Sequence, residues 1–225
     1  MSIAQRIHSI QEKISEVATE CRRLPEEITL MAVSKNQSIE GISQAIKAGI
    51  LNFGESYWQE ADAKINHFKE TPLIWHFIGP IQSNKASAIA KKVSWATVDR
   101  VDIASLLSRH RPDDLPPLNL CIQINIDNEP AKSGIPLDEL PDFVHQICYL
   151  PRLHLRGLMI IPKPQQDEAC QYRTFLRLKQ ALDTLNMTLA KPLDTLSMGM
   201  SDDITPAIKA GSTLLRIGRS IFKED

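Results

Sequence analysis

The sequence alternates, from one end to the other, between short β-branched runs and amphipathic helical segments. About eight of these runs predict strands, and they are Ile28–Val33, Leu51–Phe53, Leu73–Ile78, Trp95–Val98, Leu118–Ile126, Leu153–Ile161, Leu193–Leu196 and Ser212–Ile217. Strands that alternate with helices form a parallel sheet with helical crossovers. About eight such units in 225 residues predict one closed (β/α)8 barrel over residues 1–225. An open doubly wound sheet is the alternative, but no G-x-G-x-x-G turn follows the first expected strand.

Helical segments fill the intervals between the expected strands. Apolar residues at helical spacing predict one extra helix before the first strand: Ile3, Ile7, Ile10, Ile14 and Val17. Asp99 is placed to cap the helix after the fourth strand, and Ser201 or Asp202 to cap a last helix that ends at Gly211.

Composition narrows the classes of partner. Lys and Arg total 26 against 27 Asp and Glu, so no global charge attracts nucleic acid or a membrane surface. The four cysteines form no C-x-x-C pair, which argues against structural zinc. No apolar leader and no run of about 18 apolar residues occurs. These features predict a cytoplasmic protein, and a barrel that buries its own core is expected to be a monomer.

Lys35 is the first candidate for chemistry, because a barrel carries its site on the loops that follow the strands. This lysine comes directly after a buried strand, where its amine would be partly desolvated and its pKa lowered. A neutral amine there could attack an aldehyde and form a Schiff base. The alternative is a strand-end lysine whose ammonium simply reaches solvent. Position alone favours the alternative.

The loops after the last two expected strands are candidates for a phosphate site. Ser201 opens a helix, and Gly218 would let backbone amides approach a ligand. Alternatively, Ser201 only caps its own helix. Arg216 lies inside an apolar strand, so its guanidinium needs an acidic partner or a ligand atom. His76 also lies within a strand, and a hydrogen-bonded core histidine accounts for it most simply.

These residues belong to stretches that closely resemble the pyridoxal phosphate homeostasis protein family, whose members are alanine-racemase N-terminal-domain-like. The matching stretches follow the family's order along nearly the whole chain: Met31–Lys35, Phe53–Tyr57, His76–Lys85, Lys132–Gly134, Arg156–Met159, Leu196–Ser201 with Asp203, Gly211–Ser212 and Arg216–Gly218. The sequence departs from the family at Ser56, where the family usually has Asn.

The resemblance implies a single barrel of the alanine-racemase N-terminal type that carries pyridoxal 5′-phosphate (PLP) on Lys35 as a Schiff base. It implies that Ser201 and the backbone at Gly218 and Arg219 hold the phosphate. Arg216 would face the pyridine nitrogen; because arginine stays charged, it would not protonate that nitrogen, and the ring would be a weaker electron sink.

Ser56 and His76 complete the cofactor-binding residues that the resemblance implies. Three functions remain open: a non-catalytic PLP carrier, a small PLP-dependent amino-acid racemase, and an unrelated phosphate-binding barrel. The racemases that the chain resembles carry a second, β-rich domain with a catalytic tyrosine, whereas the tyrosines here lie in or next to expected helices: Tyr57, Tyr149 and Tyr172. We therefore expect a carrier that buffers PLP or delivers it to apo PLP-dependent enzymes.

Overall fold

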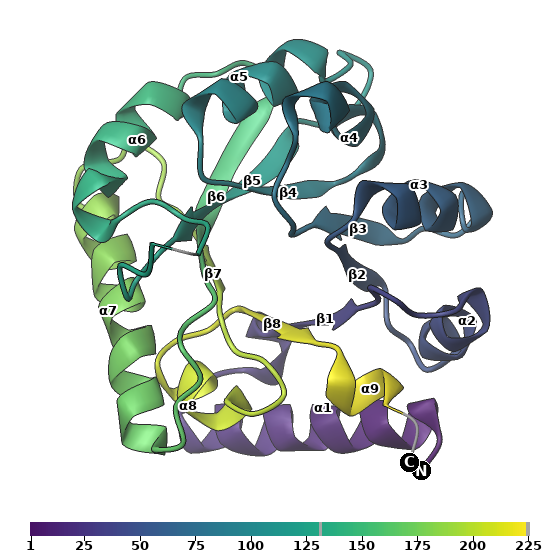
Figure 1. Cartoon of the computed structure of the whole chain (residues 1–225). Helices are drawn as coiled ribbons and strands as arrows, with labels where there is room; N and C mark the ends of the chain where they lie inside the picture. The colour runs from purple at the N-terminus through teal and green to yellow at the C-terminus, as the bar shows by residue number, and fades with distance from the viewer. Residues whose placement is uncertain (131, 224–225) are drawn as a thin grey trace.

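A computed structural model describes residues 1–130 and 132–223, so the expected domain end at residue 225 lies outside the described residues. Its described part contains a closed barrel of parallel strands in chain order, and β1 pairs with β8 to close it (Figure 1). The strands are β1 Thr29–Val33, β2 Asn52–Glu55, β3 Ile74–Phe77, β4 Trp95–Val98, β5 Leu118–Ile124, β6 Leu153–Ile160, β7 Thr195–Ser197 and β8 Leu214–Ile217. The predicted (β/α)8 barrel is confirmed, and the open sheet is wrong.

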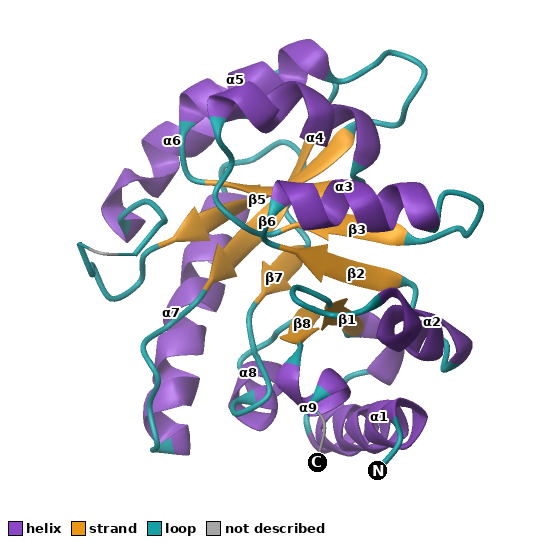
Figure 2. Cartoon of the chain, turned by 45° about the vertical axis from the view of Figure 1, so that its right-hand side comes forward, coloured by secondary structure: helices purple, strands orange, loops and turns teal. Residues whose placement is uncertain are grey.

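Helices surround the barrel (Figures 1 and 2). They are α1 Ile3–Glu20, α2 Ile39–Lys47, α3 Trp58–His67, α4 Ala86–Lys92, α5 Val101–His110, α6 Leu140–Ile147, α7 Glu168–Asn186, α8 Ile204–Lys209 and α9 Arg219–Phe222, with 3₁₀ turns at Pro25–Glu27, Ser83–Lys85 and Leu137–Glu139. α1 is the expected extra helix. It begins with a capping box formed by Ser2 and Gln5, and it packs against α2, α8 and α9.

Two of the expected helix caps are wrong. Asp99 does not cap α5, which begins after Arg100 without a side-chain cap. Its carboxylate instead accepts a hydrogen bond from the Gly134 N–H at 3.0 Å, which ties the loop after β4 to the loop after β5. The residue before α8 is Asp203 rather than Ser201 or Asp202.

The searched residues reveal no helix that is long and apolar enough to cross a membrane. The same described part of the chain holds no group of three or more His, Cys, Asp or Glu side chains that could bind a metal ion.

Candidate functional site

Lys35 and Gly218 lie together at the carboxyl ends of β1 and β8. The closure of the barrel places them there, because Ala32 of β1 pairs with Ile217 of β8. They line one cavity of about 370 Å³. Its lining residues are Val33, Lys35, Asn36, Gln37, Gly218, Arg219, Phe222 and Lys223. The amine and the glycine loop are therefore neighbours in space, as a site shared between these loops requires.

Lys35 is exposed, so the expected partial desolvation of its amine is not what the structure shows. The residue lies just beyond β1, on the loop that leads to α2. An accessible amine at this place can reach a ligand that enters the cavity from solvent.

Ser201 contacts the first turn of α9. Its Oγ accepts a hydrogen bond from the Ser220 N–H at 3.3 Å, which joins the loop after β7 to the loop after β8. The alternative in which Ser201 only caps the helix that follows it is therefore wrong, since α8 begins after Asp203. A hydroxyl beside the N-terminal N–H groups of a helix is an arrangement that suits a phosphate.

The acidic residues near this hydroxyl are engaged elsewhere. Asp202 forms an ion pair with Arg219, and Asp203 accepts a hydrogen bond from the Met200 N–H. Burial raises the pKa of Asp203, although the bond from Met200 opposes that rise. Ser201 and Ser220 line a second cavity of about 690 Å³, and Arg219 and Lys223 line both this cavity and the one beside Lys35.

Arg216 lies inside the barrel on β8 and is 4% exposed. Its Nη1 donates to Ser197 Oγ at 2.9 Å, and its Nη2 donates to the Ile160 carbonyl at 2.7 Å. Burial lowers its pKa to about 10, so the guanidinium remains charged near neutral pH. The strand register pairs Arg216 of β8 with Met31 of β1. Met31 comes four residues before Lys35, which is two repeats of the side-chain alternation of a strand.

His76 lies in a different cavity, at the amino-terminal ends of the strands, and the structure does not bring it together with Lys35. Its Nε2 is 3.0 Å from Asn52 Oδ1, and its ring stacks on Trp95 with centroids 5.3 Å apart. Burial lowers its pKa to about 3, so the imidazole is neutral. It is a hydrogen-bonded core histidine.

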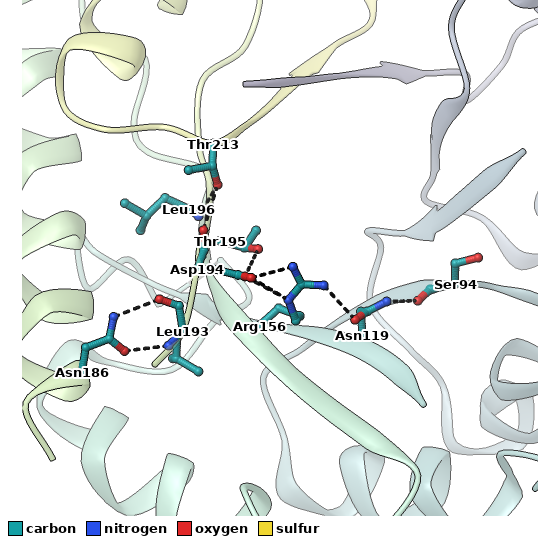
Figure 3. Close-up of polar contacts among 9 residues, drawn as sticks. All are labelled: Ser94, Asn119, Arg156, Asn186, Leu193, Asp194, Thr195, Leu196 and Thr213. Atoms are coloured by element: carbon teal, nitrogen blue, oxygen red, sulfur yellow. Dashed lines mark hydrogen bonds and ion pairs between the residues drawn. The ribbon is translucent and has the colours of Figure 1, made fainter. Parts of the chain in front are cut away.

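Sequence reasoning missed the polar network at this amino-terminal end (Figure 3). Arg156 donates through Nε and Nη2 to Asp194 at 2.9 and 2.6 Å, and through Nη1 to Asn119 at 3.2 Å. The guanidinium also lies 5.0 Å from the centroid of the Trp95 ring. The one sequence signal was a charged residue inside the apolar run that became β6.

Ser56 follows β2 and is half-buried at the same end of the barrel as Lys35. It lines a separate cavity of about 640 Å³ together with Tyr57 and Pro80. The residue before it, Glu55, forms a buried ion pair with Lys64 behind the loop that carries Lys35. Sequence reasoning also missed this pair.

The fold and the site together define a class of protein: a (β/α)8 barrel with an accessible amine, a hydroxyl beside a helix N-terminus and a buried guanidinium. These groups fit PLP, whose aldehyde, phosphate and ring nitrogen need such partners. Gly218 itself packs closely against β1, because a Cβ there would lie 3.2 Å from the Val33 carbonyl oxygen.

Comparisons with known proteins agree with this class. The family described as alanine racemase, N-terminal domain, matches residues 7–225. The pyridoxal phosphate homeostasis protein of Escherichia coli K12 is 50% identical over 224 residues, which cover 98% of this chain and 95% of that protein. The protein of the same name from Pseudomonas aeruginosa is 46% identical over 222 residues, with 98% and 95% covered.

A solved structure shows the same fold. PipY of Synechococcus elongatus, in the structure with PLP bound, has a TM-score of 0.86 and 31% identity, with 98% of this chain and 100% of that chain covered. The chain belongs to the family of pyridoxal phosphate homeostasis proteins. This membership rules against the third alternative left open by the sequence, an unrelated phosphate-binding barrel.

Proposed function

We propose that residues 1–225 form a single domain that binds PLP and serves PLP homeostasis by buffering or delivering the cofactor. The observation that carries the proposal is the cavity shared by Lys35 and the loop at Gly218 and Arg219, next to the Ser201–Ser220 contact. The names of the relatives and the PLP bound to PipY support it.

Each residue has a distinct part in this proposal. Lys35 would hold the cofactor through Nζ, at the aldehyde carbon. The Ser201 hydroxyl and the backbone N–H groups at Gly218 and Arg219 hold the phosphate. The resemblance also implies a contact between the cofactor and Ser56, which lies on the loop after the neighbouring strand β2 but lines a separate cavity. The bound cofactor supplies an electron-withdrawing ring and an exchangeable aldehyde.

Arg216 favours a carrier over a racemase. We assign its guanidinium to the ring nitrogen, since Arg216 is a buried cation inside the barrel, on the strand that pairs with β1 ahead of Lys35. A guanidinium that stays protonated donates a hydrogen bond without giving up its proton, so the ring nitrogen remains uncharged. An uncharged ring withdraws electrons weakly, which disfavours the proton removal that racemisation needs.

Borohydride trapping tests the cofactor site. Protein incubated with PLP should turn yellow, and reduction should fix the pyridoxyl mass on Lys35. The Lys35→Ala variant should lose that label, whereas Lys85→Ala, which removes a lysine from the neighbouring cavity, should keep it. A colourless protein, or equal labelling of wild type and Lys35→Ala, overturns the proposal.

A transfer assay separates a carrier from an enzyme. Loaded protein mixed with an apo PLP-dependent enzyme should activate that enzyme faster than free release of PLP allows. Alanine racemisation measured in parallel should remain far below a turnover of about 10 per second, the median for enzymes. A turnover near that value would establish the racemase instead. Size-exclusion chromatography and cell fractionation test the proposed monomer in the cytoplasm.

A further inference from the structure

The two chain neighbours of Lys35 are both held by side chains that lie behind the loop. The Ser34 carbonyl accepts a hydrogen bond from Lys64 Nζ at 2.7 Å. The Asn36 N–H donates to Glu60 Oε2 at 2.9 Å. Lys64 and Glu60 belong to α3, so this helix contacts the backbone on each side of Lys35.

A buried cluster of charges connects these contacts. Lys64 Nζ also donates to Glu55 Oε1 at 2.8 Å and to Glu60 Oε2 at 3.1 Å. Its three N–H donors therefore have partners on the loop after β1, on β2 and on α3. The Ser34 hydroxyl donates to the same Glu55 oxygen at 2.6 Å. The loop and the two carboxylates thus share one ammonium group.

The cluster lies where charges are costly to bury. The side chains of Lys64 and Glu55 are 7% and 1% exposed. Burial raises the pKa of Glu55, while the bonds from Lys64 and Ser34 oppose that rise. Apolar residues of similar volume often stabilise a fold as well as a buried ion pair does. A contribution to the stability of the fold therefore explains only weakly why the protein buries this cluster.

The loop geometry gives a stronger reason. Asn36 has a left-handed backbone with φ of 59°, which is uncommon for a residue other than glycine. Its N–H is bonded to Glu60, so the cluster holds this conformation in place. Conformations of this kind persist where the surroundings fix them, and they gather at functional sites.

We propose that Glu55, Glu60 and Lys64 are positioning residues that fix the backbone on both sides of Lys35. A fixed backbone leaves only the lysine side chain to be ordered when its amine meets the cofactor aldehyde. The inference rests on the proposed function. The three residues act through the loop and make no contact with the cofactor themselves.

Glu60→Ala is the main test, because this carboxylate is one-third exposed and its loss should be tolerated by the fold. We expect amide hydrogen exchange over residues 34–37 to become faster in cofactor-free protein, and PLP affinity to fall about tenfold. Glu60→Gln keeps an acceptor for the Asn36 N–H and should restore most of the affinity. Lys64→Met should act like Glu60→Ala.

Lys92→Met is the matched control. It breaks the 2.6 Å ion pair between Lys92 of α4 and Asp62 of α3, which does not touch the Lys35 loop.

Formaldehyde with cyanoborohydride gives a second readout, since this small aldehyde needs no phosphate site. Methylation of Lys35 should stay within about twofold of wild type in Glu60→Ala, although PLP binding falls.

The outcomes separate this inference from the proposed function. Unchanged exchange over residues 34–37 in Glu60→Ala, or PLP binding equal to that of Lys92→Met, overturns the positioning role. Wild type that takes up no PLP on Lys35 overturns the proposed function; the exchange result on cofactor-free protein then still decides whether the cluster fixes the loop. Failure of Lys64→Met to fold leaves Glu60→Ala to give the answer.

Discussion

Arg216 donates through Nη1 to the hydroxyl of Ser197 inside the barrel, over 2.9 Å. Its second bond, to the Ile160 carbonyl, connects the guanidinium of β8 to β6 as well as to β7. Both partners belong to neighbouring strands of the barrel, so these bonds fix the orientation of the guanidinium. Such preorganisation reduces the cost of ordering the site on binding.

Arg216→Lys should destabilise the protein although it keeps the charge. A lysine cannot reproduce two directed bonds from one planar group, and it would leave a buried carbonyl or hydroxyl unpaired. We expect a loss of about 2 to 4 kcal/mol in the free energy of unfolding, measured by urea denaturation of cofactor-free protein. Arg219→Lys, at an exposed ion pair, should change it by about 0.5 kcal/mol or less. Equal effects of the two variants would contradict the prediction.

Ser201→Ala should weaken PLP binding with little effect on folding. The hydroxyl accepts one hydrogen bond, from Ser220, in a half-buried position, so its loss should cost the phosphate one donor. We expect PLP affinity to fall about three- to tenfold, measured by absorbance titration. Ser43→Ala removes a comparable hydroxyl bond within α2 and serves as the control. A titration curve that coincides with that of the control would exclude Ser201 from the phosphate site.

The sequence was sufficient for the barrel because each strand and helix carries its own pattern of apolar residues. The proximity of Lys35 and Gly218 then followed from closure, since the first and last strands of a barrel must pair. The candidate site at the carboxyl ends was thus predictable from the order of the elements alone.

The missed features depend on contacts between distant loops. The position of Asp99 predicted a helix cap. In the fold its carboxylate instead accepts a hydrogen bond from the Gly134 N–H, which belongs to a distant loop. α9 has only four residues, too few for a periodic pattern, and its start is fixed by the Ser201 contact. The Glu55–Lys64 pair joins a strand to the following helix, and neither residue type predicts burial.

Two glycines should respond in opposite ways to alanine. A Cβ at Gly157 of β6 would lie 1.7 Å from the Thr195 carbonyl oxygen on the paired strand β7, so the strands would have to separate. We expect Gly157→Ala to cost about 3 kcal/mol or more. A Cβ at Gly41 of α2 would meet nothing closer than 3.5 Å. Gly41→Ala should therefore add about 0.5 to 1 kcal/mol. Thermal and urea unfolding measure both, and a tolerated Gly157→Ala would show that the barrel wall can shift.

His76 should make the protein less stable as the pH falls. Its pKa is about 3 in the folded barrel, because burial disfavours the charged ring, against about 6.5 in the unfolded chain. Below about pH 6.5, His76 is protonated in the unfolded chain. In the folded state it stays neutral until the pH falls to about 3. The free energy of unfolding should therefore decrease over that window by about 1.4 kcal/mol per pH unit from this residue.

Urea denaturation of His76→Gln at several pH values isolates this contribution. Between about pH 6 and pH 4, the free energy of unfolding of the variant should fall less steeply with pH than that of wild type, by about 1.4 kcal/mol per pH unit. This difference does not depend on the stability of the variant at neutral pH. A His76→Gln slope that matches wild type would mean that the ring accepts its proton while buried between Asn52 and Trp95.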